Sequence, residues 1–275
     1  MKKIKQLLSI SVLLSLLLLT SLSFSLPKGL ASDQEAETVS LVFPEDNIKV
    51  VSIKKSEKNQ QANYQIILRY PQLSGTNLSN GAQGFNHIIQ MVIKDQTSQF
   101  TKSLQENLAN KNLFPKANSY LKIDYDNLQS FMSASLKTNY ISVLFKINSF
   151  QLGMAHPYQE NISINYELSQ NKKLELEDLF KPNFNYLSFL ANSSRSMLKN
   201  KNIPFDMLTA GTAPKIENFK NWNLTLKGLL ITFDEAQVAP RYYGQQQVLI
   251  PNAELKSVLS HSAACTLGII RCDAT

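Results

Sequence analysis

The chain contains few of the residues from which metal sites and nucleophilic sites are built. Its 275 residues include two cysteines, three histidines and one tryptophan. The histidines are His87, His156 and His261, and we recognise no zinc or metalloprotease cluster around them. No Gly-x-Ser-x-Gly elbow and no phosphate-binding loop occurs. The sequence therefore predicts no catalytic, cofactor-binding or metal-binding residue.

The positive charge of the chain is concentrated at its N-terminus. The whole chain has 28 basic and 21 acidic residues, and four of the lysines lie within residues 1–31. Residues 32–275 are left with 24 basic and 21 acidic residues, a net charge of +3. This balance is ordinary for a globular domain, and no basic stripe runs beside the aromatic residues. Nucleic acid is therefore not an expected partner.

Residues 1–31 have the three-part pattern of a secretory signal peptide. Three lysines precede an uncharged apolar run over residues 7–26, and small residues follow at the position that a signal peptidase reads. An apolar run of about 20 residues is also long enough for an uncleaved membrane anchor. Its six serines and the closing Pro27 favour cleavage. We expect cleavage near Ser32, a periplasmic or extracellular protein, and no stable membrane anchor afterwards.

The two cysteines lie near the C-terminus, in a tail over residues 261–275. Outside the cytoplasm, Cys265 and Cys272 are candidates for a disulfide. It would close a loop of about 8 residues and constrain the unfolded chain by about 2–3 kcal/mol. The alternative is two free thiols on a frayed tail.

Hydrophobic periodicity predicts an α+β fold in which a largely antiparallel sheet packs against two main helices. The expected strands are 48–53, 64–69, 119–126, 129–136, 139–148, 160–168, 221–226, 228–233 and 246–250. The expected helices lie at about 80–108 and 184–200, with a short last helix opened by Pro251. Pro71 is expected to end the second strand, and Asn171 to adopt a left-handed turn conformation.

One face of the strand 139–148 is wholly apolar and should be core: Ile141, Val143, Phe145 and Ile147. Acidic residues recur in pairs or triplets, at Asp124/Asp126, Glu175/Glu177/Asp178 and Asp234/Glu235. Such groups usually form a solvated face, and Asp178 is interpreted as the cap of a turn or helix. His156 has the chemistry of a general base or pH sensor, but we expect it to be buried and hydrogen-bonded and to hold a loop in place.

Several short motifs follow one another in a recognisable order. They are Gly153–Pro157, Asn165–Leu168, Asn171-Lys172, Leu176–Phe180, Gly228–Phe233, Val238–Pro240, Gly244 and Val248–Pro251, with Leu68–Gly75 upstream. In this order they resemble the extracytoplasmic family shared by the anti-sigma factor RsiV and the N-terminal region of the peptidoglycan deacetylase PdaC. The motif residues Gly153, His156, Pro157, Asn165, Asp178, Phe180 and Gly244 are interpreted as structural.

The resemblance implies an N-terminal half over residues 45–150 and a C-terminal half over residues 151–260. Three positions depart from the family pattern, where Met154 replaces a glycine, Glu167 an aspartate and Asn171 the glycine of the turn. Only six residues precede the apolar run and no deacetylase motif is recognised, so we expect neither a sigma-binding segment nor a deacetylase catalytic domain. We therefore expect a non-enzymatic binding module.

The RsiV-like receptors bind lysozyme, so the resemblance implies a lysozyme-type protein as the first candidate ligand. Peptidoglycan or another cell-wall glycan is the alternative ligand. A cell-wall hydrolase whose acidic residues lie in an unrecognised cleft is the second alternative, since sequence alone does not place two carboxylates across a cleft.

Overall fold

The structure is a computed structural model that describes residues 30–43, 48–109, 118–151 and 153–272. The expected signal peptide lies outside the described residues except for Leu30 and Ala31. These two residues begin the first strand, β1 (Leu30–Phe43). The mixed α and β composition agrees with the predicted α+β class.

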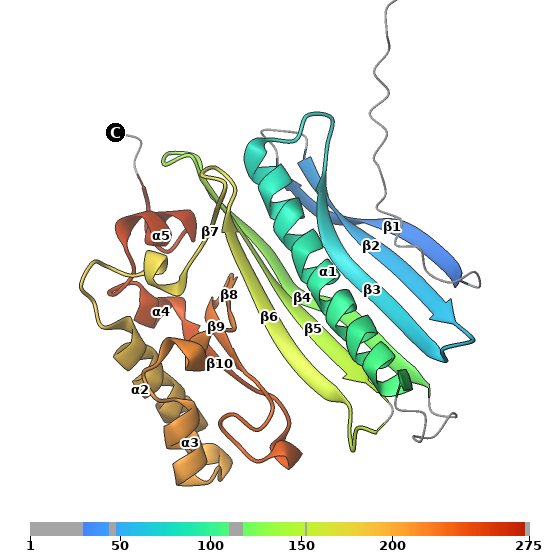
Figure 1. The fold of residues 1–275 in the computed structure, drawn as a ribbon. Helices are drawn as coiled ribbons and strands as arrows, with labels where there is room; N and C mark the ends of the chain where they lie inside the picture. The colour runs from blue at the N-terminus through green and yellow to red at the C-terminus, as the bar shows by residue number, and fades with distance from the viewer. Residues whose placement is uncertain (1–29, 44–47, 110–117, 152, 273–275) are drawn as a thin grey trace, which may run out of the picture.

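Seven strands form one sheet in which the spatial order equals the order along the chain (Figure 1). Every neighbouring pair is antiparallel except β3 and β4, which run parallel. After β1 the strands are β2 (Ile48–Asn59), β3 (Tyr64–Ser74), β4 (Ser119–Ser133), β5 (Thr138–Phe150), β6 (Tyr158–Glu167) and β7 (Lys172–Lys173).

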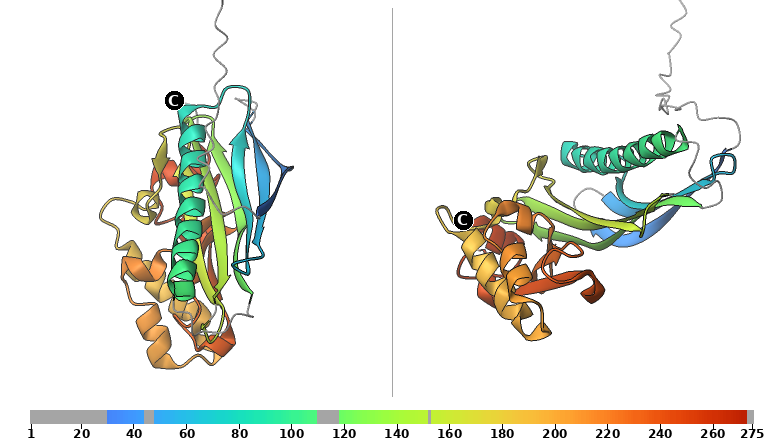
Figure 2. Two further views of the ribbon diagram at one scale, coloured as in Figure 1. Left: turned by 45° about the vertical axis from the view of Figure 1, so that its right-hand side comes forward. Right: turned by 60° about the horizontal axis from the view of Figure 1, so that its bottom comes forward.

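The parallel pair is connected by a long helix, α1 (Asn80–Ala109), which lies along one face of the sheet (Figures 1 and 2). Ser79 begins the helix by accepting a hydrogen bond from the backbone N–H of Ala82 at 3.2 Å. Phe85 and Ile89 are buried toward the sheet, as the helical spacing of apolar residues predicts. Gly81 allows a close approach, because a Cβ atom there would lie 1.7 Å from the carbonyl oxygen of Leu168.

Two strand predictions are wrong in detail. The segments 119–126 and 129–133 are not separate strands but belong to β4, which bends where its register with β5 shifts between Asp126 and Gln129. Residues 134–136, predicted as strand, form the turn before β5. Asn127 takes a left-handed conformation at this bulge, with φ of 51°. Pro71 does not end β3 but pairs with Ser52 of β2. Pairing of β3 with β4 stops at Leu68, so a residue without an N–H is tolerated beyond it.

The second half of the chain forms a three-stranded antiparallel sheet with short helices around it (Figure 1). Its strands are β8 (Trp222–Thr225), β9 (Gly228–Phe233) and β10 (Gln246–Pro251), and its helices are α2 (Tyr186–Leu198), α3 (Phe205–Gly211), α4 (Asn252–Leu255) and α5 (His261–Thr266). The sequence predicts α2 and the short helix α4 after Pro251, but it assigns α3 to a loop and does not predict α5, which follows α4. Among the described helices, none combines the length and apolarity needed to cross a membrane.

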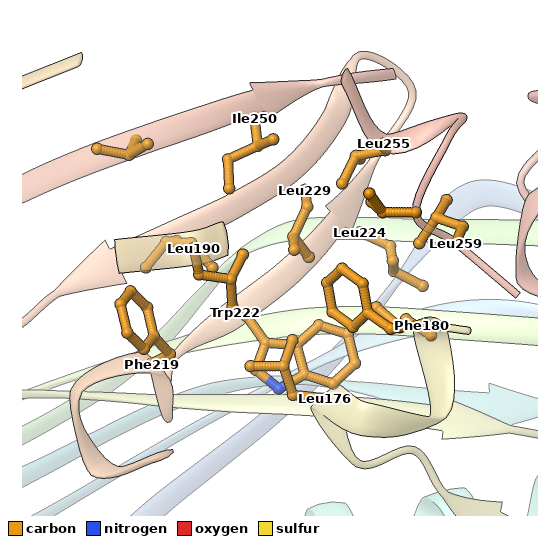
Figure 3. Close-up of a cluster of buried hydrophobic side chains, with 14 of the residues drawn as sticks. Leu176, Phe180, Leu190, Phe219, Trp222, Leu224, Leu229, Ile250, Leu255 and Leu259 are labelled. Carbon is orange, nitrogen blue, oxygen red and sulfur yellow. The ribbon is translucent and has the colours of Figure 1, made fainter. Parts of the chain in front are cut away.

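Buried apolar residues form two cores. The first lies between α1 and the seven-stranded sheet and includes the predicted set Ile141, Val143, Phe145 and Ile147. The second is formed mainly by the second half, around Trp222 and Phe180 (Figure 3). Tyr140 joins this second core from the opposite face of β5. The expected boundary between the halves, at residues 150 and 151, falls at the β5–β6 loop, while β6 stays in the seven-stranded sheet.

Candidate functional site

A buried hydrogen-bond network, which we call the seam, joins the two sheets. The Ser142 hydroxyl on β5 donates to Oδ1 of Asn165 on β6 at 2.6 Å. It also accepts from Nδ2 of Asn223 and from the backbone N–H of Leu224, both at 3.0 Å. The Asn165 amide donates to the carbonyl of Trp222 at 2.8 Å. Every polar group in this set has a partner, so the seam fixes β8 against β5 and β6.

A second polar cluster lies farther along β6 and centres on Asp234, which follows β9. Its Oδ1 atom accepts from the amides of Asn161 at 3.0 Å and Asn221 at 3.1 Å. Its Oδ2 atom forms a 2.9 Å ion pair with Lys220, and this hydrogen bond raises the pKa of the lysine. Three donors from two segments, β6 and the two residues before β8, therefore occupy this carboxylate, which acts as a junction between β6 and the small sheet.

Glu160 is the carboxyl group of this region whose pKa is raised. Burial raises its pKa, the charges of Asp234 and Asp95 raise it further, and Lys220 opposes the shift. Glu160 and Glu235 line a small hollow of about 40 Å³, with Lys146, Ile147, Asn148, Gln159, Asn161 and Gln245. The hollow presents amide and carboxylate groups, which can hydrogen-bond hydroxyl-rich or amide-containing ligands.

The β5–β6 loop projects from the same end of the molecule (Figure 1), and its residues 153–158 are exposed. The sequence interpretation of His156 as a buried, hydrogen-bonded residue is wrong, because its side chain is exposed and has no hydrogen bond within the described part of the chain. Gly153 has φ of +92° and starts the chain reversal. Met154 and Tyr158 expose 38% and 49% of their surface, so this loop presents apolar groups to solvent.

A short 3₁₀ turn, η4 (Arg241–Tyr243), borders this end of the molecule. Arg241 is held by Glu235 through a 2.7 Å ion pair, and Tyr242 is 82% exposed. Gly244 ends the turn with φ of 67°, a conformation that favours glycine. We refer to the β5–β6 loop and η4 together as the loop edge.

Of the other motif residues, Asn165 belongs to the seam, and Asp178 and Phe180 lie at the opposite end. Asp178 is the last acid of a capping box in the 3₁₀ turn η1 (Leu176–Leu179), where it accepts from the backbone N–H of Glu175 at 2.8 Å. It also binds Lys172 at 2.9 Å, so it stabilises a turn, as the sequence predicts. Phe180 pairs with Leu259 in a β-bridge and lies in the second core. The motifs are thus divided between the loop edge and the core.

The cysteines of the tail meet at α5. Cys265 and Cys272 form a disulfide with a Cα–Cα distance of 5.7 Å. Nε2 of His261 lies 3.5 Å from Sγ of Cys265. Sequence reasoning misses this grouping, although the four-residue spacing of a helix places His261 and Cys265 on one face.

Comparison with known proteins identifies the family signal in the second half. The sequence profile described as "Protein of unknown function (DUF3298)" matches residues 177–253. These residues run from η1 to the start of α4. They include Trp222 of the seam, the Asp234 junction and η4, but not the β5–β6 loop.

Two further comparisons reach beyond that segment. The chain is 35% identical over 111 residues to the peptidoglycan-N-acetylmuramic acid deacetylase PdaC of Bacillus subtilis, which is 39% of this chain and 24% of PdaC. The chain thus spans about a quarter of this curated relative. A DUF3298 family structure from Bacteroides fragilis has 18% identity and a TM-score of 0.51, and the match covers 88% of this chain and 97% of that one. The chain therefore carries a DUF3298 segment within a fold similar to that of a solved DUF3298 protein.

Proposed function

We propose that this chain is a non-enzymatic binding module of the cell envelope that recognises a secreted, lysozyme-type protein through the loop edge. The observation that carries the proposal is the projecting β5–β6 loop, in which Met154 and Tyr158 are exposed. Exposed tyrosines beside a fixed scaffold are typical anchors of protein interfaces. Tyr242 adds a second exposed aromatic residue at this edge.

The scaffold beneath the loop edge suits binding rather than catalysis. The seam and the Asp234 junction hold the halves together, so the loops project from a fixed base. Three donors hold the carboxylate of Asp234 in place, which supports a structural role for this residue. Recognition by preformed loops costs less conformational entropy than recognition by a segment that orders on binding.

The cell envelope is the proposed location for two reasons. The matched relative, PdaC, is named for its action on peptidoglycan. The N-terminal sequence also has the pattern of an export signal, from which we propose a periplasmic or extracellular position. The lysozyme-type ligand rests on the resemblance to RsiV-like receptors together with the shape of the projecting loop.

A cell-wall glycan is the second candidate ligand. The hollow next to Glu160 offers the amides of Asn148, Gln159 and Gln245, and amide groups pair well with sugar hydroxyls. PdaC supports this candidate as well, since its named substrate is a peptidoglycan component. A glycan ligand would lie over the hollow and contact the amides at its rim, because the hollow itself, about 40 Å³, is too small for a sugar ring. A protein ligand would cover the whole loop edge.

Titration of the exported chain against a panel of lysozymes, with calorimetry and muramidase turnover recorded together, tests the proposal. A protein ligand should bind with one-to-one stoichiometry, bury roughly 1,200–2,000 Å² and inhibit turnover stoichiometrically. No heat and no inhibition, together with sedimentation with insoluble peptidoglycan, would replace it with the glycan candidate. Release of soluble sugar or acetate from peptidoglycan would show an enzyme.

A further inference from the structure

Helix α5 and the tail that follows it bring three metal-ligating side chains together. His261 and Cys265 share one face of α5, and the chain then reverses at Gly268, which has φ of +66°. This reversal returns Cys272 to the helix. Nδ1 or Nε2 of His261 and the Sγ atoms of Cys265 and Cys272 all lie within 4.8 Å of one another.

The contacts of α5 hold His261 and Cys265 in place, and a hollow next to the cluster leaves room for a cation. Thr266 of α5 and Thr138 of β5 are hydrogen-bonded at 2.5 Å, which fastens the helix to the large sheet. Cys265 is buried and His261 is exposed, so the cluster is open to solvent on one side. Next to it is a hollow of about 550 Å³ lined by Met132, Ser133, Ala134, Ser135, Cys265, Ile270 and Cys272.

We propose that reduction of the Cys265–Cys272 disulfide converts this cluster into a Zn²⁺ site. A dithiol reductant supplies two electrons and two protons and becomes a disulfide itself, while Cys265 and Cys272 become thiols. On binding Zn²⁺, each thiol loses one proton and becomes a thiolate ligand. Neutral His261 is the third ligand, so the occupied site has no net charge. Water from the adjacent hollow fills the fourth position.

The distances agree with this assignment. Zn–S bonds of about 2.3 Å and Zn–N bonds of about 2.0–2.1 Å at tetrahedral angles separate a sulfur from a nitrogen ligand by roughly 3.5 Å. The observed separation of Cys265 Sγ and His261 Nε2 is 3.5 Å. The two sulfurs have to move apart, to roughly 3.8 Å on the same geometry. The sulfur of Cys272 starts within 4.8 Å of the His261 ring nitrogen. Cys272 lies beyond the reversal at Gly268, on the tail, so this movement leaves α5 undisturbed.

The Zn²⁺ ion and the disulfide cannot be present at the same time. Each of them links Cys265 to Cys272. In the oxidised chain the sulfurs are bonded to each other and cannot act as thiolate ligands. In the reduced chain, Zn²⁺ keeps the tail attached to α5 in place of the covalent bond. The segment is therefore closed in both redox states wherever Zn²⁺ is present.

The test uses the whole chain in its oxidised and fully reduced forms, titrated with Zn²⁺ against a chromophoric chelator. We expect one Zn²⁺ per reduced chain and none per oxidised chain. His261→Ala should weaken binding at least tenfold, and His261→Gln serves as a second variant with side-chain bulk retained. His87→Ala is the matched control, because His87 is exposed on α1 away from the cluster and should leave the affinity unchanged.

Two further measurements complete the design. Co²⁺ in place of Zn²⁺ should give the visible absorption of a tetrahedral thiolate site in the reduced wild type and not in Cys272→Ser. Bound Zn²⁺ should also slow reoxidation of the thiols. Failure of the reduced chain to compete with the chelator, equal affinity of wild type and His261→Ala, or equal binding by the oxidised chain would each overturn the proposal. Binding of Cu⁺ but not Zn²⁺ would overturn the assignment of the cation.

Discussion

The side-chain amide of Asn165 on β6 donates a hydrogen bond to the backbone carbonyl of Trp222 on β8, at 2.8 Å. This bond crosses from the large sheet to the small one. The acceptor side of the same amide receives the Ser142 hydroxyl at 2.6 Å, and both side chains are almost fully buried. A single motif residue therefore satisfies two buried groups on different strands.

Replacing Asn165 by alanine should destabilise the protein. The Trp222 carbonyl and the Ser142 hydroxyl would each lose a partner, and a buried polar group without a partner costs about 1–3 kcal/mol. We expect a loss of about 2–4 kcal/mol in the free energy of unfolding, measured by urea denaturation. Asn192→Ala on the exposed side of α2 is the control and should change stability by less than about 0.5 kcal/mol. A loss at position 165 no larger than that of the control would contradict the role of the seam.

The raised pKa of Glu160 predicts a pH dependence of stability. The pKa of the folded state lies above the ordinary value of 4.5, so protonation favours the folded state. The stability that Glu160 contributes is present below about pH 4.5 and is lost as pH rises through the raised pKa. Glu160→Gln should therefore be more stable than wild type at pH 7, and the difference should vanish below pH 4.5. Thermal melts across this range are the measurement, with Glu106→Gln on α1 as the control for a lost negative charge.

Removing the aromatic ring at the loop edge should reduce binding without affecting the fold. Tyr158 is about half exposed, so Tyr158→Ala should change the free energy of unfolding by less than about 0.5 kcal/mol. If the residue anchors a protein ligand, the dissociation constant should rise at least tenfold, which corresponds to about 1.4 kcal/mol. Calorimetry with the ligand found in the lysozyme panel measures it. Leu226→Ala, in the exposed β8–β9 turn, is the matched control and should bind as wild type does.

Helix α1 offers a test in which two effects oppose each other. Glycine-to-alanine exchange inside a helix normally stabilises by about 1 kcal/mol. At Gly81 the new Cβ would meet the backbone oxygen of Leu168 at 1.7 Å, and overpacking of this kind typically costs about 1–3 kcal/mol. We therefore expect Gly81→Ala to lower the melting temperature.

Gly84 is the matched control for Gly81 in the same helix. There the Cβ would meet the side chains of Asn171 and Tyr166, which can move, rather than a backbone atom. Gly84→Ala should therefore cost less than Gly81→Ala. The reverse order would show that the approach of α1 to Leu168 is looser than the structure describes.

The disulfide predicts a simple chemical result. Denatured, unreduced protein should react with no thiol reagent at Cys265 or Cys272, whereas the reduced protein should react at both, as mass spectrometry can show. Cys265→Ser with Cys272→Ser, in metal-free buffer, should lower the free energy of unfolding by about 2–3 kcal/mol, since the closed loop is short. Two labelled cysteines in the unreduced protein would exclude the bond.

Local sequence patterns predicted the elements that have one wholly apolar face. The 3.6-residue spacing of α1 and the alternation in β5 are strong because each has a full apolar face. Asn171 was predicted correctly as left-handed, with φ of 52°, because asparagine tolerates that conformation. The sequence of β1 has no wholly apolar face and did not predict a strand. The segment is extended because its backbone pairs with β2.

The candidate site depends on contacts that no local pattern contains. Ser142 meets Asn223 across 81 positions of the chain, and Asn161 meets Asp234 across 73. The exposure of His156 follows from where the β5–β6 loop projects, which depends on the packing of both halves. The grouping of His261 with Cys265 has a signal in the sequence, the four-residue spacing of a helix, but the helix His261–Thr266 was not predicted and the grouping was missed.

Strand β5 has no face of its own in contact with solvent over most of its length, because α1 covers one side and the second half covers the other. Ile141 and Val143 belong to one core, while Tyr140, between the same neighbours along the chain, belongs to the other. Loss of either core would expose side chains of β5, and the other core is built on the same strand. The molecule should therefore lose its structure in one cooperative transition, with a single calorimetric peak whose van't Hoff and calorimetric enthalpies agree.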